Sequence, residues 1–243
     1  MATGPELKID IAEKRFPGAP DALFAGLRLD IAPSSVVALV GPSGIGKSTL
    51  LRMIAGIDTD FSGSVEIGGQ AARAAPTPGF VFQDPRLLPW LTAIDNIRAA
   101  DPDCTHEQAM EVLGRVGLAG AGALYPYQLS GGMQRRVALA RALVVNARLL
   151  LLDEPFVSLD RTLVGEIHAL FARLVAESRP TVVFVSHLTE DAAALADRAV
   201  LLGHRPACIV ADMSLPIAGA ERDQATLERY RAMLDGALES DGD

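Results

Sequence analysis

The sequence predicts an α/β fold in which a mainly parallel sheet is flanked by helices. Three observations support this prediction: short apolar strands alternate with amphipathic helices, one apolar run (Leu149–Leu152) is typical of a strand buried on both faces, and a glycine-rich turn joins a strand to a helix at residues 41–48. A chain of 243 residues can bury a sizeable core, so we expect residues 1–243 to form a single domain.

The spacing of apolar residues places the elements in chain order. Alternation predicts a half-buried strand at 7–11, and a β-branched run at 35–40, ended by Gly41-Pro42, predicts a buried one. A helix at 48–55 ends near Gly56. The remaining predicted elements are strands at 64–67, 79–83, 148–152, 181–186 and 198–202, and helices at 106–116, 132–145, 162–177, 189–196 and 225–238.

Residues 84–128 interrupt this alternation. Four prolines break the segment into short pieces, and only one helix is expected between them; the prolines are Pro85, Pro89, Pro102 and Pro126. We predict a helical subdomain over about 84–146, inserted into the α/β pattern, and a short C-terminal helix over about 223–238.

The charge balance excludes some classes of function. Thirty acidic and 22 basic residues give a net charge of -8, which argues against a broad nucleic-acid-binding face. Only three of the basic residues are lysines, so a lysine in a motif stands out. Cys104 and Cys208 have neither disulfide-framework nor zinc-site spacing, and a reducing cytoplasmic setting is expected.

Residues 41–48, Gly-Pro-Ser-Gly-Ile-Gly-Lys-Ser, match the pattern G-x-x-x-x-G-K-[ST]. Glycines let backbone N–H groups turn toward a phosphate, and the following helix N-terminus adds partial positive charge. Lys47 would reach the β- and γ-phosphates, and the Ser48 hydroxyl would ligate Mg²⁺. The alternative is a glycine-rich turn capped by Ser48, which leaves Lys47 without a role.

Two adjacent carboxylates, Asp153 and Glu154, follow the apolar run 149–152. At the mouth of a buried strand they repel each other and lose hydration, so they need a cation or a proton. Asp153 is placed to hold Mg²⁺, and Glu154 could polarise an attacking water as a general base. The alternative, a solvated strand-to-loop turn, is disfavoured beside a phosphate loop.

A second helix start has the composition of an anion site. Residues 129–134 read Leu-Ser-Gly-Gly-Met-Gln, so Ser130 and two glycines open the helix and leave its first N–H groups bare. Ser130 alone is an ordinary N-cap. Gly131 and Gly132 weaken a helix, however, and are best explained if something must approach closely.

In this order the motifs resemble those of the ATP-binding subunit of an ATP-binding cassette (ABC) transporter, over roughly residues 5–215. The resemblance identifies Gln83 as the Q-loop glutamine, residues 129–134 as the signature, Asp153-Glu154 as the end of the Walker B strand, Asp160 as the D-loop acid and His187 as the switch histidine. It implies a P-loop NTPase fold with an antiparallel β subdomain beside the parallel core.

The resemblance also implies roles for individual residues. Two cassettes would pair head to tail, so that ATP on the phosphate loop of one meets Ser130 and Gly132 of the other. Catalysis would rest on Glu154, His187, Gln83 and Lys47, and Mg²⁺ on Ser48, Gln83 and Asp153. The nucleotide-binding residues would be Gly41, Pro42, Ser43, Gly44, Ile45, Gly46, Lys47, Ser48, Thr49, Phe16, Ser130, Gly131, Gly132 and Asp160.

Alternatives stay open for two of these residues. Phe16 is the best match to the aromatic residue that stacks on adenine, and a core role is an equal alternative. His187 could instead be a strand-end histidine with a local hydrogen bond. The other histidines, His106, His168 and His204, lack a motif and are expected at the surface.

The segment Leu87-Leu-Pro-Trp-Leu-Thr92 resembles importers of the nitrate, sulfonate and taurine group, where it lies near the groove for the permease's coupling helix. Its apolar residues, with Trp90 the only tryptophan, would either bind that partner or pack the subdomain core. Two departures weaken the substrate assignment: Leu188 follows the switch histidine where Asp is usual, and Tyr127 precedes the signature where His is common.

We therefore expect the ATP-hydrolysing subunit of an ABC importer, with ATP and Mg²⁺ as cofactors. It would be peripheral on the cytoplasmic face of the inner membrane, bound to transmembrane permease subunits and to a second copy or a paralogous cassette. A substrate-binding protein would act indirectly, and nucleic acid would not be a partner. The alternative class is a soluble ABC ATPase of DNA repair or the ribosome, which coiled-coil or zinc insertions or a second cassette would indicate.

Overall fold

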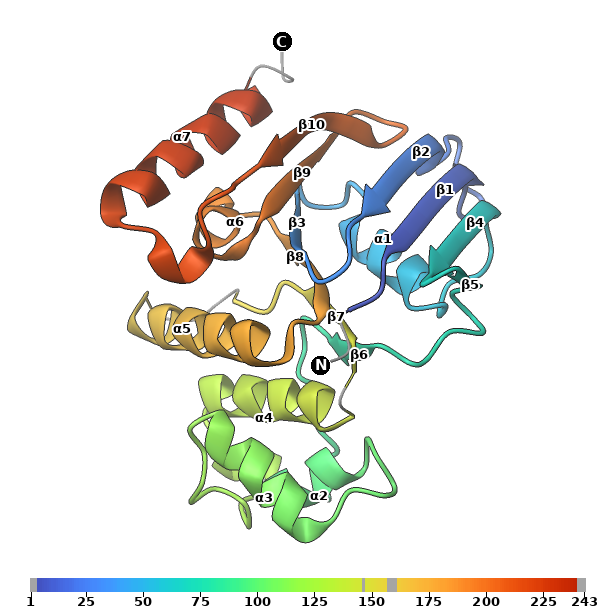
Figure 1. Ribbon diagram of the computed structural model, residues 1–243. Helices are drawn as coiled ribbons and strands as arrows, with labels where there is room; N and C mark the ends of the chain where they lie inside the picture. Colours follow the sequence, from blue (N-terminus) through green and yellow to red (C-terminus); the bar gives the residue numbers. More distant parts are fainter. Residues whose placement is uncertain (1–3, 146, 157–160, 240–243) are drawn as a thin grey trace.

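A six-stranded sheet forms the centre of the computed structural model, which describes residues 4–145, 147–156 and 161–239 (Figure 1). The strand order is β10-β9-β3-β8-β7-β6, and neighbours run parallel except for the antiparallel outer pair β9 and β10. The strands are β3 (Val36–Val40), β6 (Gly79–Val81), β7 (Leu149–Asp153), β8 (Thr181–Ser186), β9 (Arg198–Gly203) and β10 (Cys208–Ser214).

The inner strands of this sheet contribute to two layers of the core. In β3, Val36, Ala38 and Val40 pack with residues of the helices on one face, whereas Val37 and Leu39 pack with the layer on the other face. Residues 149–152 of β7 divide in the same way, and all are buried. The prediction of a strand buried on both faces is confirmed.

A second, antiparallel sheet lies beside the first, with the order β2-β1-β4-β5. Its strands are β1 (Leu7–Lys14), β2 (Phe24–Ile31), β4 (Ser62–Ile67) and β5 (Gln70–Ala71). Helix α1 (Lys47–Ile54) shares the core layer between the two sheets. Strand β2 is not among the predicted strands, because Gly26, at φ +72°, interrupts the apolar alternation of that strand.

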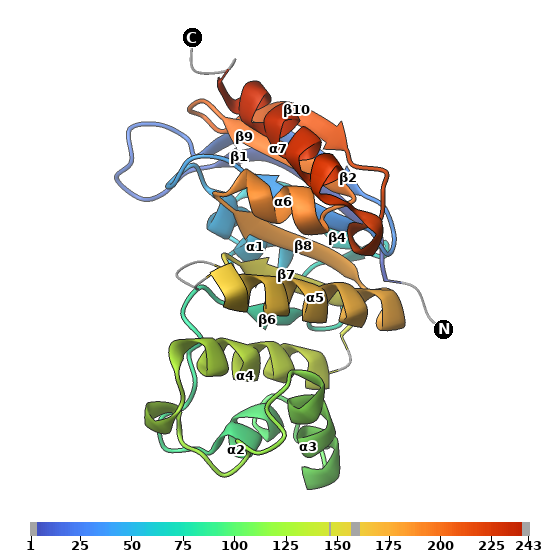
Figure 2. The same ribbon diagram turned by 90° about the vertical axis from the view of Figure 1, so that its left-hand side faces the viewer.

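Three helices cover the other face of the central sheet: α5 (Arg161–Ser178), α6 (Thr189–Leu195) and α7 (Gln224–Glu239). Figure 2 shows them on the side that faces the viewer, with α6 between α5 and α7. Among the described residues, no helix is long and apolar enough to cross a membrane.

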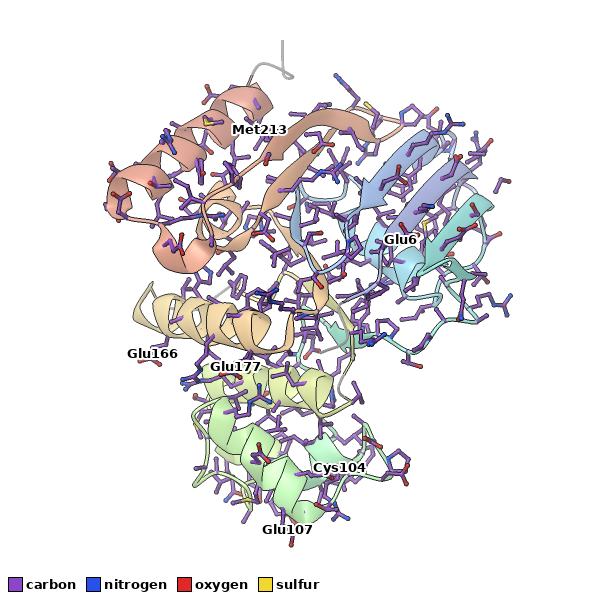
Figure 3. The ribbon with its side chains drawn as sticks, viewed as in Figure 1. Glu6, Cys104, Glu107, Glu166, Glu177 and Met213 are labelled. Atoms are coloured by element: carbon purple, nitrogen blue, oxygen red, sulfur yellow. The ribbon has the colours of Figure 1, made fainter. Side chains whose placement is uncertain are left out.

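The helices α2 (Ala93–Arg98), α3 (His106–Arg115) and α4 (Gly131–Val144) form a separate group at one end of the molecule (Figures 1 and 2). Two ion pairs join this group to α5: Arg115 Nη2 lies 2.9 Å from Glu177 Oε2, and Arg136 Nη2 lies 3.8 Å from Glu166 Oε2. Figure 3 labels both glutamates on α5. Helix α2 is not among the predicted helices, because six residues are too few to display a helical period.

Candidate active site

Three neighbouring parallel strands bring the sequence motifs to one edge of the central sheet. Val40 at the end of β3 pairs with Ser186 at the end of β8, and Asp153 at the end of β7 pairs with Val185. The phosphate loop, His187 and Glu154 therefore all begin at the carboxyl edge, which is where ligands bind in open α/β sheets.

The phosphate loop turns between β3 and α1 in a backbone conformation that requires glycine. Gly46 has φ +112°, and a Cβ atom there would lie 2.7 Å from Cζ of Phe24. Gly44 has φ +77°, and a Cβ atom there would lie 3.8 Å from Nη2 of Arg205. The loop can therefore approach a ligand with its backbone, as the sequence pattern predicts.

Lys47 is buried at the start of α1, and its ammonium group is held by the loop itself. Nζ donates hydrogen bonds to the carbonyl oxygens of Gly41 at 2.7 Å and Pro42 at 2.9 Å. Burial lowers the pKa of Lys47, and the negative charges of Glu154 and Asp153 oppose that shift. A cation lies under the loop where the pattern places the β- and γ-phosphates.

Ser48, at the start of α1, is joined to Asp153, at the end of β7: Ser48 Oγ donates a hydrogen bond to Asp153 Oδ1 at 2.7 Å. Burial raises the pKa of the Asp153 carboxyl, and the Ser48 hydrogen bond and the charge of Arg52 oppose the shift. Two hard oxygen donors fit Mg²⁺, which takes one or two protein oxygens and completes its shell with phosphate and water.

Glu154 lies at the centre of a three-residue cluster. Gln83 Nε2 donates to its Oε2 at 3.1 Å, and His187 Nδ1 lies 3.6 Å from its Oε1. The backbone of Glu154 is left-handed, at φ +48°, and its N–H donates to the carbonyl of Val185 at 3.1 Å. Strain of this kind is stored where a side chain must point in one direction.

Phe16 lines an open cleft of about 340 Å³ together with residues of the phosphate loop, Gln83 and Glu154. The Phe16 ring is 44% exposed and lies 5.1 Å from Nζ of Lys14. The alternative of a core role for Phe16 is therefore wrong.

Sequence reasoning missed Arg205, which lies in the turn between β9 and β10. With Phe16 and Gly44 it lines an adjoining cavity of about 280 Å³. Ala207 N–H donates to the carbonyl of Leu23 at 2.7 Å and holds the turn in place. No local pattern marks an arginine in a turn as part of a site, so only the fold could reveal it.

The structure does not bring the signature residues to this cleft. Ser130 caps α4, because its Oγ accepts a hydrogen bond from Met133 N–H at 3.3 Å, and the helix begins at Gly131. Ser130, Gly131 and Gly132 do not line the cleft. Ser130 and Gly131 are exposed, and the space around Gly131 is open. Asp160 lies outside the described residues.

The apolar segment at 87–92 has residues in both of the expected arrangements, one packed in the core and one exposed where a partner could bind. Leu87 packs against the core, whereas Trp90 is 69% exposed. The buried Asn96 holds the segment: its side chain donates to the carbonyls of Leu88, Leu91 and Thr92 at 3.0–3.1 Å and accepts from Leu88 N–H at 2.7 Å. Trp90 is thus presented on a fixed loop.

The histidines without a motif differ from one another. His106 and His204 are exposed, as expected. The surface prediction for His168 is wrong: its side chain is only 16% exposed and lies against Phe156 and Asp191. A lone histidine in a helical pattern gives no sign of these partners.

Comparison with known proteins decides the family. Residues 24–157, more than half of the chain, match the family described as ABC transporter. The chain belongs to this family. The cassette is 42% identical over 229 residues to an aliphatic sulfonates import ATP-binding protein, SsuB 1, of Pseudomonas aeruginosa, covering 90% of this chain and 91% of that one. An SsuB 2 of Xanthomonas axonopodis is 45% identical over 217 residues, covering 88% and 73%.

Solved structures agree with this assignment. The cassette is similar to the dimeric ATP-binding cassette MJ0796 in a post-hydrolysis state bound to ADP and Pi, with a TM-score of 0.76 and 29% identity over 86% of this chain and 98% of that one. A second dimeric structure of MJ0796 gives a TM-score of 0.77. The predicted fold class is confirmed, and the cassette is an ATPase that binds ATP.

Proposed function

We propose that this cassette hydrolyses ATP in the cleft above the phosphate loop to power the import of aliphatic sulfonates. The observation that carries the catalytic part is the convergence of Lys47, Asp153 and Glu154 at one sheet edge. The substrate class rests on the relatives, which are named as importers of aliphatic sulfonates.

Glu154 is the general base of the proposed reaction. Its carboxylate takes a proton from the attacking water, which then adds to the γ-phosphorus as the bond to the β-phosphate oxygen breaks. Gln83 orients this carboxylate by donating to Oε2, and His187, 3.6 Å from Oε1, contacts the γ-phosphate. The contacts of Gln83 and His187 with the Glu154 carboxylate support these roles.

Lys47 and its neighbours hold the triphosphate. The ammonium exchanges its two loop carbonyls for phosphate oxygens, while backbone N–H groups of residues 43–49 surround the phosphates. Ser48 and Asp153, with Gln83 close by, would hold Mg²⁺, which neutralises charge on the phosphates. Phe16 would stack on adenine at the other end of the cleft.

A second copy of the cassette, or a paralogue, completes each site in this proposal. Ser130 and Gly131 are exposed at the start of a helix whose next residue, Gly132, is buried, and a facing γ-phosphate suits the backbone N–H groups of this helix start. Asp160 would link the two sites. The dimeric state of the MJ0796 structures supports this arrangement.

The proposed partner on the membrane side is a permease, and the proposed location is the cytoplasmic face of the inner membrane. Trp90, held outward by the Asn96 loop, is the anchor that fits a hydrophobic partner helix. A substrate-binding protein would deliver the sulfonate to the permease without touching the cassette.

The test is purification of the tagged cassette from gently solubilised native membranes, followed by ATPase assays in vesicles. We expect a multi-span permease to co-purify with the cassette. The binding protein of that permease should stimulate ATP hydrolysis more when it is loaded with an alkanesulfonate than when it is loaded with nitrate. Trp90→Ala should release the permease, whereas Ile57→Ala, at an exposed apolar residue elsewhere, should not. Recovery of soluble nucleoprotein partners alone would overturn the transport role, and stimulation by nitrate alone would overturn the substrate.

A further inference from the structure

We propose that His168 and Asp191 are positioning residues that hold the His187 loop against Glu154. The proposal rests on the role proposed above for His187. It starts from four contacts that no sequence motif joins: Phe156 to His168, His168 to Asp191, Asp191 to Ser186, and Ser186 to the backbone beyond His187.

Ser186 fixes the backbone on both sides of His187. It is the last residue of β8, and its Oγ accepts a hydrogen bond from Leu188 N–H at 3.0 Å. The hydroxyl therefore closes a tight turn whose middle residue is His187. Leu188, the N-cap residue of α6, makes no side-chain cap hydrogen bond, so this turn restrains the start of the helix.

Asp191 orients the Ser186 hydroxyl. Ser186 Oγ donates to Asp191 Oδ2 at 2.6 Å, a charge-assisted hydrogen bond between two buried groups. With its proton directed to Asp191, the hydroxyl presents a lone pair to Leu188 N–H. Asp191 is 3% exposed, so water does not compete for this bond.

His168, on α5, faces the other oxygen of the Asp191 carboxylate. Its Nε2 lies 3.2 Å from Oδ1, at ion-pair distance but out of line for a hydrogen bond. This nitrogen is buried and has no hydrogen-bond partner among the described residues. A buried polar atom in this state needs a reason. A proton on Nε2 supplies one, because it is attracted to the Asp191 carboxylate 3.2 Å away, and this attraction holds Asp191 toward Ser186.

The same ring contacts the segment that follows Glu154. The edge of His168 meets Phe156 with the ring centroids 4.5 Å apart, and Phe156 also packs edge-on against Phe171 and Phe184. His168 thus contacts Phe156, two residues after Glu154. It also contacts Asp191, which is hydrogen-bonded to Ser186, the residue before His187. This placement keeps the 3.6 Å approach of His187 to Glu154 at a fixed geometry.

The start of α6 is also tied to α7, which makes Asp191 a rigid support. Thr189 Oγ1 donates to Asp235 Oδ1 at 2.5 Å, and Arg231 Nη2 lies 2.9 Å from Glu190 Oε1. The first turn of α6 is therefore hydrogen-bonded to α7 and to the end of β8, and it lies against His168 of α5. A positioning carboxylate needs a support of this kind.

The experiment measures kcat, KM for ATP and melting temperature for His168→Leu, which keeps the contact with Phe156 and removes the polar edge. We expect kcat to fall about 10-fold, as for loss of a supporting contact behind an active-site ligand, with the affinity for ATP unchanged. His168→Gln, which restores a donor toward Asp191, should recover part of kcat. His106→Leu, at an exposed histidine, is the matched control.

A double-mutant cycle separates positioning from general destabilisation. Because His168 acts through His187, His168→Leu should lower kcat no further in a His187→Ala background. Ser186→Ala should behave in the same way and serves if His168→Leu does not fold. Wild-type kcat in both single variants, or an equal further loss in the His187→Ala background, would overturn the inference. Wild-type kcat in His187→Ala alone would overturn the role of His187 as well.

Discussion

The two motifs that suggest anion binding, the phosphate loop and the signature, differ in how far one chain completes them. At the phosphate loop, Lys47 and Asp153 are buried, bonded to neighbours and shifted in pKa. At the signature, Ser130 is exposed, and its hydroxyl accepts a hydrogen bond from Met133 of its own helix. The first site is assembled from buried side chains held by hydrogen bonds, whereas the second is a helix start at which Ser130 and Gly131 are exposed. A single chain thus carries an assembled half and an exposed half, and in the proposed head-to-tail dimer the exposed half faces the phosphate loop of the partner.

The largest effect is expected at the assembled half. Glu154→Gln keeps the shape and the contact with Gln83 but cannot take a proton, so kcat should fall roughly 10²–10⁴-fold. ATP should still bind and, without hydrolysis, should hold two copies together, which size-exclusion chromatography would detect. Glu111→Gln, at an exposed glutamate of α3, is the control. Unchanged turnover in Glu154→Gln would exclude Glu154 as the general base.

The exposed half is tested by Ser130→Arg. The long cation should block the approach of a second copy and abolish hydrolysis, while the isolated subunit binds ATP with unchanged affinity. Mixing this inactive variant with inactive Glu154→Gln should restore part of the activity, because one site of the mixed dimer has both halves intact. No recovery on mixing would contradict the head-to-tail arrangement.

A smaller effect is expected at the rim of the cleft. Phe16→Ala should weaken ATP binding about 10-fold, the order expected for loss of one base–aromatic stack, whereas Phe16→Tyr should bind normally. Calorimetry with inorganic triphosphate provides the contrast, since that ligand has no base and should bind both variants equally. Equal weakening for both ligands would show that Phe16 acts on the loop and not on adenine.

The smallest effect concerns stability without nucleotide. Burial raises the pKa of Asp153 in the folded state, so its charged form opposes folding at neutral pH and this cost disappears as the pH falls below that pKa. Asp153→Asn should therefore raise the melting temperature by a few degrees, where 1 kcal/mol corresponds to roughly 2–4 °C. Differential scanning calorimetry should show the gain shrinking in acid. Asp103→Asn, at an exposed aspartate, should show neither change.

The sequence predicted the assembled half better than the elements around it. Glycine, lysine and paired acids have few other uses at that spacing, and the parallel order of β3, β8 and β7 brings them together. Gly26 concealed β2, because one residue with positive φ breaks the alternation by which strands are detected. His168 could not be predicted because its partner Asp191 comes from another helix, and contact between helices is a property of the fold.

The outward position of Trp90 makes the cassette its own fluorescent reporter. It is the only tryptophan in the chain, it is 69% exposed, and the residues that line the nucleotide cleft include no other indole. Emission from the free cassette should therefore be that of a solvated indole. A blue shift on adding the permease would report burial of this one residue, so docking can be titrated without a label.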